Sequence, residues 1–155
     1  MSEHKATIEW QLNDGGDFLK SRFSREHTWT FDGGLSVPAS ATPAVVPPPL
    51  SNPAGVDPEE AFVASLASCH MLTFLFLASR SGFAVQSYRD DAVGTLSKGE
   101  GGRQWISTVV LKPRVNFSGD RMPTPEEQDK LHHDAHEQCF IANSVKTQVT
   151  VQASA

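Results

Sequence analysis

The chain has 155 residues, of which 39% are hydrophobic and 20% are charged, and its formal net charge is -5. This length is typical of one domain that buries most of its apolar surface. Charges of both signs are spread along the chain without a basic stripe, which argues against a nucleic-acid binder. The first residues, MSEHKATIEW, lack the basic region and apolar run of a signal peptide, so we expect a cytoplasmic protein.

Two strands are expected first. Residues 6–12, ATIEWQL, carry β-branched and aromatic residues in partial alternation and end at the turn NDGGD. Residues 22–31, RFSREHTWTF, lead into a second turn, DGG. The chain therefore opens with two short strands separated by glycine-rich turns.

A long connection follows at residues 36–57. The proline run at 47–49 is incompatible with a regular helix or an interior strand. A loop of this length inside a compact domain is usually functional or disordered. Because it is uncharged before its last residue and has apolar anchors, we expect an ordered arm that lies on a surface, such as that of a partner subunit. The anchors are Val45, Val46 and Leu50.

Residues 61–79 contain no formal charge and approach the length of a membrane span. Polar residues such as Ser65 and His70 interrupt this run, and no basic loop precedes it. We therefore expect no membrane insertion, but the core helix of a soluble protein, buried on nearly all sides. In DPEE, Asp57 is a suitable N-cap with Glu60 at the third helical position, which is typical of a helix start.

The remaining elements alternate between strands and one helix. Residues 83–97 and 103–117 are rich in β-formers and flank the hairpin sequence KGEGG. A second helix is expected from Pro125, after the cap Thr124, to residue 138, and a last strand lies within 144–152. This order predicts a single α+β domain over residues 1–155, with antiparallel sheets packed on a buried central helix and a second helix.

The chain has two cysteines, Cys69 and Cys139. Cys69 lies in an apolar stretch of the first helix, where a free cysteine is usually a small hydrophobic core residue. The adjacent His70 points about 100° away on a helix, so it is poorly placed to take the Cys69 proton. These residues alone leave a core role and a chemical role open.

The second helix suggests a metal site as an alternative. His132, His136 and Cys139 recur at i, i+4 and i+7, which places them on one helical face. With Cys69 they could form a Cys₂His₂ zinc site. Closely paired cysteines, which are common in structural zinc sites, are missing. The competing interpretation is that His132, His133 and His136 form a solvated helix face.

The contexts of the two cysteines together resemble a known family. The segment VDPEEAFVASLASCHMLTFL is similar to the cysteine-bearing helix, and HEQCFIANSVKTQVTV to the ending, of the OsmC/Ohr family of thiol-dependent peroxidases. That family comprises osmotically inducible protein C and the organic hydroperoxide resistance proteins. The resemblance spans nearly the whole chain. It implies an OsmC-like intertwined homodimer that uses no cofactor.

The resemblance also implies roles for single residues. Cys69 would be the peroxidatic cysteine and Cys139 the resolving cysteine, so that a Cys69 sulfenic acid condenses to a disulfide. A thiol or dithiol reductant would then reduce that disulfide. Glu59 would hold an arginine that stabilises the thiolate, and we identify this arginine as Arg25, with Arg22 as the second choice.

The expected substrate is an organic hydroperoxide. Apolar residues around Cys69 would bury its alkyl part and disfavour hydrogen peroxide. These residues are Phe62, Leu66, Leu72 and Phe76. Phe140 stands where the family usually has proline, which leaves the subfamily open and keeps a noncatalytic OsmC-fold binding protein as an alternative.

Helix geometry adds an expectation about the dimer. The ten helical residues from Glu59 to Cys69 cover about 15 Å, which is too far for Glu59 to hold an arginine against Cys69 of the same helix. If these groups cooperate, we expect Glu59 and the arginine to come from the other subunit.

Overall fold

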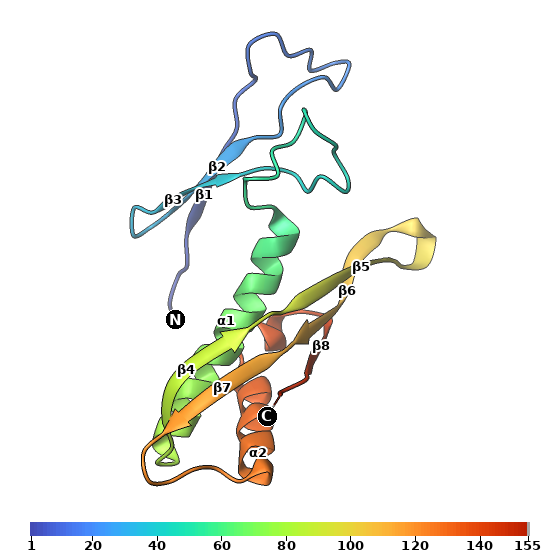
Figure 1. The fold of residues 1–155 in the computed structure, drawn as a ribbon. Helices are drawn as coiled ribbons and strands as arrows, with labels where there is room; N and C mark the ends of the chain where they lie inside the picture. Colours follow the sequence, from blue (N-terminus) through green and yellow to red (C-terminus); the bar gives the residue numbers. More distant parts are fainter. Residues whose placement is uncertain (155) are drawn as a thin grey trace. The chain divides into compact units, whose positions relative to one another are not determined.

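The structure, a computed structural model, describes residues 1–154. The chain divides into two compact units, Met1–Ala61 and Phe62–Ala155, and each is described by itself. The elements of both units are labelled in Figure 1. Two helices and several sheets confirm the α+β class expected from the sequence.

The first unit contains a three-stranded antiparallel sheet in the order β1-β2-β3. Its strands are β1 (Ala6–Glu9), β2 (His27–Phe31) and β3 (Ser36–Ala39). The DGG sequence forms the β2-β3 turn, and Gly34 adopts a φ of 85°, which glycine tolerates without a steric penalty. The strand expected at residues 6–12 is confirmed, but β1 is shorter and ends at Glu9.

The second strand begins later than expected, at His27 instead of residue 22. The backbone N–H of Arg25 donates to the carbonyl of Leu50 at 2.9 Å, so it is not part of the sheet ladder. The Trp10 indole donates to the carbonyl of Ser24 at 2.8 Å, so this carbonyl is bonded to a side chain and not to a neighbouring strand. Arg25 therefore lies in a loop, and the expectation of a strand position for it was wrong.

The proline-rich segment begins with β3, and its last residues form hydrogen bonds with the end of that strand. The N–H of Val56 donates to the carbonyl of Pro38, and the N–H of Ser40 donates to the carbonyl of Val56, each at 3.0 Å. The Asn52 amide donates to the Glu26 carboxylate at 2.8 Å. Proline fits β3 because this strand is at the edge of the sheet.

Capping boxes begin both helices, α1 (Pro58–Arg80) and α2 (Pro125–Gln138). At α1, the N–H of Glu60 donates to Asp57 Oδ1 at 2.7 Å, and the N–H of Asp57 donates to Glu60 Oε2 at 3.2 Å. At α2, Thr124 and Glu127 make the equivalent pair of bonds. Both helix starts expected from the sequence are confirmed.

The strands of the second unit form two sheets. In one, β4 (Ala84–Asp90) pairs antiparallel with β7 (Pro113–Ser118). In the other, β6 (Gln104–Leu111) pairs antiparallel with β5 (Val93–Lys98) and parallel with β8 (Gln148–Val151). Short 3₁₀ turns lie at Glu100–Gly102 and Ala142–Ser144. The last strand expected from the sequence is thus present, but it pairs parallel to β6, whereas antiparallel sheets were expected.

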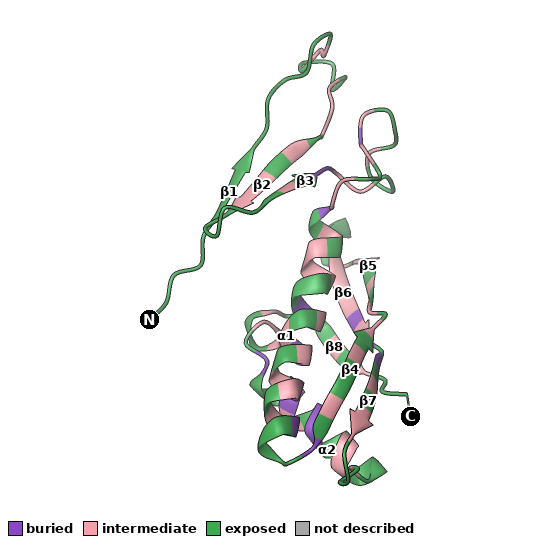
Figure 2. Cartoon of the chain, turned by 60° about the vertical axis from the view of Figure 1, so that its left-hand side comes forward, coloured by how far each residue is buried: buried purple, intermediate pink, exposed green. Residues whose placement is uncertain are grey.

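One stripe of α1 is buried, as Figure 2 shows along the helix. Its members recur every four residues, the spacing of a single helical face. They are Leu66, His70, Phe74 and Ala78. Leu66 packs with Val109 and Leu111, whereas Phe74 and Ala78 pack in a second cluster with three further buried residues, Phe83, Leu131 and Ala135.

The opposite face of α1 corrects the expectation of a helix buried on nearly all sides. Leu72 is 61% exposed and Phe76 is 59% exposed, because the strands and α2 of one chain cover only part of this helix. The length and composition of α1 are sufficient for a membrane-spanning helix, but core helices of soluble proteins meet the same two criteria. The exposed apolar face is therefore available for a partner surface.

A histidine pair joins the two helices inside the core. His70 Nε2 of α1 and His132 Nδ1 of α2 are 3.1 Å apart, and the two rings are stacked. His132 also stacks on Phe74, with ring centroids 4.3 Å apart. Burial lowers the pKa of both histidines to about 4. Both rings are therefore neutral near neutral pH.

This pair predicts acid lability. A folded pKa below the ordinary value means that the unfolded chain binds more protons, so the stability is complete above about pH 6.5 and falls towards about pH 4. The expected loss for the pair as a unit is of the order of 3 kcal/mol. A His70→Leu/His132→Leu double variant should lose most of this pH dependence in urea unfolding measured across that range.

The matched control is His133→Leu, because His133 lies on the same helix but is exposed. This variant should keep the acid dependence of the wild type. A double variant that remains as acid-labile as the wild type would contradict the role of the pair.

Candidate active site

The second unit brings the two cysteines together. Cys69 lies in the middle of α1 and is half-buried, whereas Cys139 caps the C-terminus of α2 and is 1% exposed. Both are free thiols, and Cys69 lies near enough to Cys139 to raise the pKa of the Cys139 thiol. A half-exposed thiol close to a buried thiol is an arrangement from which a disulfide can form.

Burial raises the pKa of the Cys139 thiol to about 11, and the nearby Cys69 thiol acts in the same direction. The N–H of Ala142 donates to Cys139 Sγ at 3.4 Å and opposes this effect. Cys139 is therefore a protonated thiol at neutral pH. Because the thiolate is the nucleophilic form, Cys139 is unsuited to react first with an external substrate.

An apolar hollow of about 510 Å³ is lined by residues that lie within a few positions of each cysteine in the sequence. Thr73, one of its lining residues, donates its hydroxyl to the carbonyl of Cys69 at 2.9 Å. Phe140, directly after Cys139, is 82% exposed. The lining residues are Leu72, Thr73, Phe76, Gln138, Phe140 and Asn143. The sequence singled out Phe140 only as a departure from a family pattern, and its place at this surface was not expected.

The four apolar residues expected around the substrate separate into three environments. Leu72 and Phe76 line the hollow beside the cysteines. Phe62 lines another hollow, of about 360 Å³, together with Trp105, Ile106 and residues 145–147. Leu66 is 1% exposed and belongs to the core. The structure thus groups only Leu72 and Phe76 near the thiols.

The expected charged residues lie in the first unit. The Arg25 guanidinium donates to the backbone carbonyls of Ser21 and Phe23 and lies 3.7 Å from the centroid of the Phe23 ring. Within residues 1–154 Arg25 makes no ion pair with a carboxylate. Glu59 is half-buried in the first turn of α1, and Arg22 is exposed. Of the two arginines, Arg25 is the more constrained.

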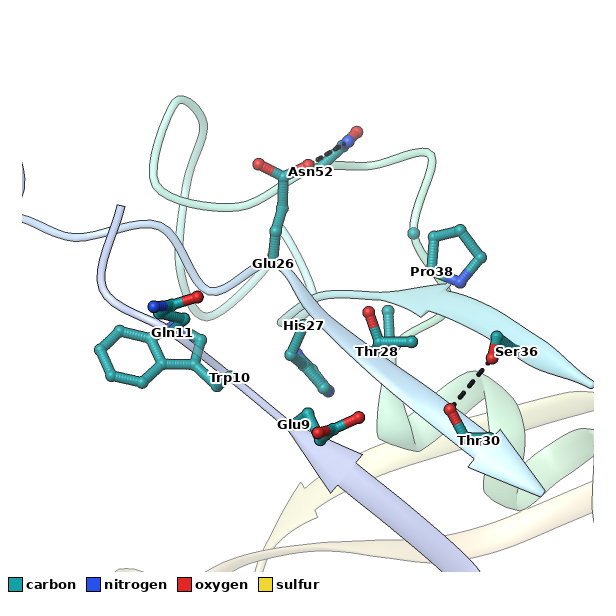
Figure 3. Close-up of a pocket in the computed structure, with 12 residues that line it drawn as sticks. Glu9, Trp10, Gln11, Glu26, His27, Thr28, Thr30, Ser36, Pro38 and Asn52 are labelled. Atoms are coloured by element: carbon teal, nitrogen blue, oxygen red, sulfur yellow. Dashed lines mark hydrogen bonds between the residues drawn. The ribbon is translucent and has the colours of Figure 1, made fainter. Parts of the chain in front are cut away.

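A polar groove of about 900 Å³ crosses the sheet of the first unit (Figure 3). His27 lies in it, with Nδ1 2.7 Å from the carbonyl of Arg25 and Nε2 accepting from the Trp29 indole at 2.9 Å. The alternation in HTWTF predicts that His27 and Trp29 share a face, but nothing in the sequence marked a groove. The groove contains no cysteine and offers no nucleophile for peroxide chemistry.

The histidines of α2 do not form the zinc site considered from the sequence. Within the described part of the chain, residues 1–154, no group of three or more His, Cys, Asp or Glu residues is arranged to hold a metal ion. His132 is 5% exposed and bonded to His70, so the expectation that it lies on a solvated face was wrong. His133 and His136, with Asp129, line a hollow of about 420 Å³ next to β8.

Comparison with known proteins identifies the family. The model of the family described as OsmC-like protein matches residues 51–154, which include both cysteines and both helices. The chain belongs to the OsmC-like family. A search of curated proteins gave no match.

Solved OsmC-like structures share the fold. An OsmC-like protein of unknown function from Vibrio cholerae is 52% identical, with a TM-score of 0.97 over 99% of this chain and 100% of that one. An organic hydroperoxide resistance protein OsmC from Legionella pneumophila, also described as a predicted redox protein, is 15% identical (TM-score 0.75, 100% and 98% covered). An organic hydroperoxide resistance protein from Bacillus subtilis is 19% identical (TM-score 0.66, 99% and 98% covered).

The difference in burial between the two thiols of this OsmC-like chain predicts selective alkylation. Iodoacetamide should label Cys69 at least about tenfold faster than Cys139 in the reduced native protein, because Cys139 is buried and protonated. Peptide mass spectrometry over a time course measures both rates, and labelling in denaturant serves as the control. Equal native rates would contradict the assigned difference.

Proposed function

We propose that this OsmC-like protein is a cysteine-based peroxidase that reduces organic hydroperoxides to alcohols. The observation that carries the proposal is the proximity of a half-exposed Cys69 to a buried Cys139. Hydroperoxide resistance proteins are among the solved structures that share its fold, in agreement with this proposal. The proposed location is the cytoplasm.

The proposed reaction has two steps on the protein. The Cys69 thiolate attacks the distal oxygen of the hydroperoxide, the O–O bond breaks, and the alkoxide takes a proton and leaves as the alcohol. The Cys139 thiol then attacks the sulfur of the Cys69 sulfenic acid, which forms the disulfide and releases water. A thiol or dithiol reductant returns both cysteines to thiols.

The apolar hollow supports an organic substrate over hydrogen peroxide. Leu72 and Phe76, with Phe140, would contact the alkyl or aryl group while the peroxide oxygens reach Cys69. We assign substrate contact to Leu72 and Phe76 among the residues expected from the sequence. Leu66 acts through core packing, and Phe62 lies in the neighbouring hollow.

A homodimer completes the proposal. The exposed apolar side chains of α1 favour coverage by a second copy, because large exposed apolar surface is unfavourable in water. About 15 Å of helix separates Glu59 from Cys69, so the charged pair proposed to stabilise the thiolate would come from the partner subunit. Arg25, whose backbone N–H is bonded to the carbonyl of Leu50 and whose guanidinium is held by backbone carbonyls, is the proposed arginine, and Glu59 is its proposed carboxylate partner.

The two cysteines should fail in different ways when each is replaced. Cys69→Ser should abolish consumption of cumene hydroperoxide, because no nucleophile remains. Cys139→Ser should react once and stop, because the sulfenic acid at Cys69 lacks its resolving thiol. Stopped-flow consumption assays with stoichiometric and excess peroxide measure both outcomes. A wild-type single-turnover rate in Cys69→Ser would refute the assignment.

Mixing of inactive subunits tests the dimer and the arginine together. Arg25→Gln and Cys69→Ser should each be nearly inactive alone, whereas a refolded equimolar mixture should recover about a quarter of wild-type activity. Half of such dimers are mixed, and each mixed dimer joins an intact Cys69 to an intact Arg25 of its partner.

Arg22→Gln is the matched control for this experiment, because Arg22 is exposed in the same loop, and it should stay active. An inactive mixture of inactive parents would show that Arg25 does not act across subunits. Full activity of Arg25→Gln alone would exclude Arg25 from the site.

A further inference from the structure

The buried pair of His70 and His132 takes no part in the proposed chemistry, yet its hydrogen bond links the two helices that carry the thiols. His70 is 1% exposed and His132 is 5% exposed. The Phe74 ring stacks on His132 beside their hydrogen bond. The other ring nitrogen of His70, Nδ1, has no hydrogen-bond partner within residues 1–154. A buried polar bond of this kind is costly to break, because each nitrogen would be left unpaired.

The position of the pair relates it to the cysteines. His70 follows Cys69 directly on α1, and His132 precedes Cys139 by two helical turns on α2. Apolar packing also joins these helices, since Phe74 and Ala78 belong to the same buried cluster as Leu131 and Ala135. Apolar contacts tolerate small sliding movements, whereas a hydrogen bond between two specific nitrogens restricts both separation and register.

Disulfide formation is sensitive to this restriction. The two Cα atoms of a disulfide must lie within about 4.4–6.8 Å of each other, so a small shift of α2 against α1 decides whether Cys139 can reach Cys69. We propose that His70 and His132 are positioning residues that hold α1 and α2 in the register in which the Cys139 thiol reaches Cys69. The biological purpose of this positioning rests on the proposed function, whereas the positioning of the two thiols does not depend on peroxidase activity.

The consequence for the reaction is a choice between two fates of the Cys69 sulfenic acid. With the pair intact, the sulfenic acid and the Cys139 thiol form a disulfide and water. With the pair broken, a second hydroperoxide oxidises the sulfenic acid to sulfinic acid and leaves as an alcohol. The pair therefore protects Cys69 from irreversible oxidation.

The charged groups around the pair permit this role at neutral pH. His136 lowers the pKa of His70, and Asp129 partly opposes the lowering for His132, both from α2. Tyr88 of β4 contacts Phe74, and burial raises its pKa, so it stays neutral. With both rings neutral, one nitrogen donates and the other accepts. The bond therefore couples the two tautomers, because the ring that donates makes the other ring the acceptor.

The test uses variants that keep or remove the hydrogen bond. His132→Asn places an amide near the position of Nδ1, and His70→Gln places one near Nε2, so both preserve polar pairing. His132→Leu and His70→Leu fill similar volume without it. Circular dichroism and thermal unfolding confirm which variants are folded.

The full-length variants are equilibrated in glutathione redox buffers near neutral pH, and the Cys69-Cys139 disulfide is quantified by alkylation and mass spectrometry. The leucine variants should lower the equilibrium constant for disulfide formation by about tenfold or more, and the amide variants by less than about threefold. In peroxide, the leucine variants should form sulfinic acid at Cys69 while their first oxidation rate stays unchanged.

Two results would overturn the inference. One is a leucine variant that forms the disulfide as favourably as the wild type. The other is an equal loss in the amide and leucine variants, which would point to general packing. Because glutathione drives the equilibrium without peroxide, a wild type that forms the disulfide but consumes no hydroperoxide would contradict the proposed function and leave the positioning role standing.

Discussion

The packing of α1 against α2 is the constraint on which the candidate site depends. One stripe of α1 enters the core every four residues, and its central members, His70 and Phe74, meet α2 through His132. Cys69 is adjacent to this stripe and not within it, so its thiol is half-exposed while its backbone is held rigidly. A thiol on the edge of a rigid core can meet both solvent and a buried partner.

The same packing explains the contrast between the two thiols. Cys139 ends α2, and the chain turns directly afterwards, with the Asn143 N–H donating to the Cys139 carbonyl at 3.0 Å. This turn buries the Cys139 sulfur and exposes Phe140. The burial that raises the pKa of Cys139 thus arises from how the helix ends. The proposed division of roles between the thiols follows from their positions on the two helices.

The sequence could predict features that depend on local chemistry. The boxes at Asp57 and Thr124 require only residues three positions apart, and both helix starts were correct. The buried stripe of α1 could not be chosen in advance, because Leu72 and Phe76 are as apolar as Leu66 and Phe74. Only tertiary packing distinguishes these two faces.

Long-range contacts account for the other differences. Arg25 has a strand-like sequence context, but the carbonyl of Leu50 takes its N–H and holds it in a loop. His132 belongs to a run of polar residues typical of a solvated helix, and its burial depends on His70 from another helix. The proximity of the two thiols could not be derived from any local pattern, because Cys69 and Cys139 lie on different helices, and a redox pairing was suggested only by resemblance to a family.

The central claim is that Cys69 and Cys139 act as one redox pair in the reduction of a hydroperoxide. The most direct measurement is intact and peptide mass spectrometry of the reduced wild type after one equivalent of cumene hydroperoxide. The account predicts loss of both free thiols, an intrachain Cys69-Cys139 disulfide and one equivalent of cumyl alcohol. Two free thiols with unreacted peroxide, or oxidation of Cys69 alone without the disulfide, would contradict it.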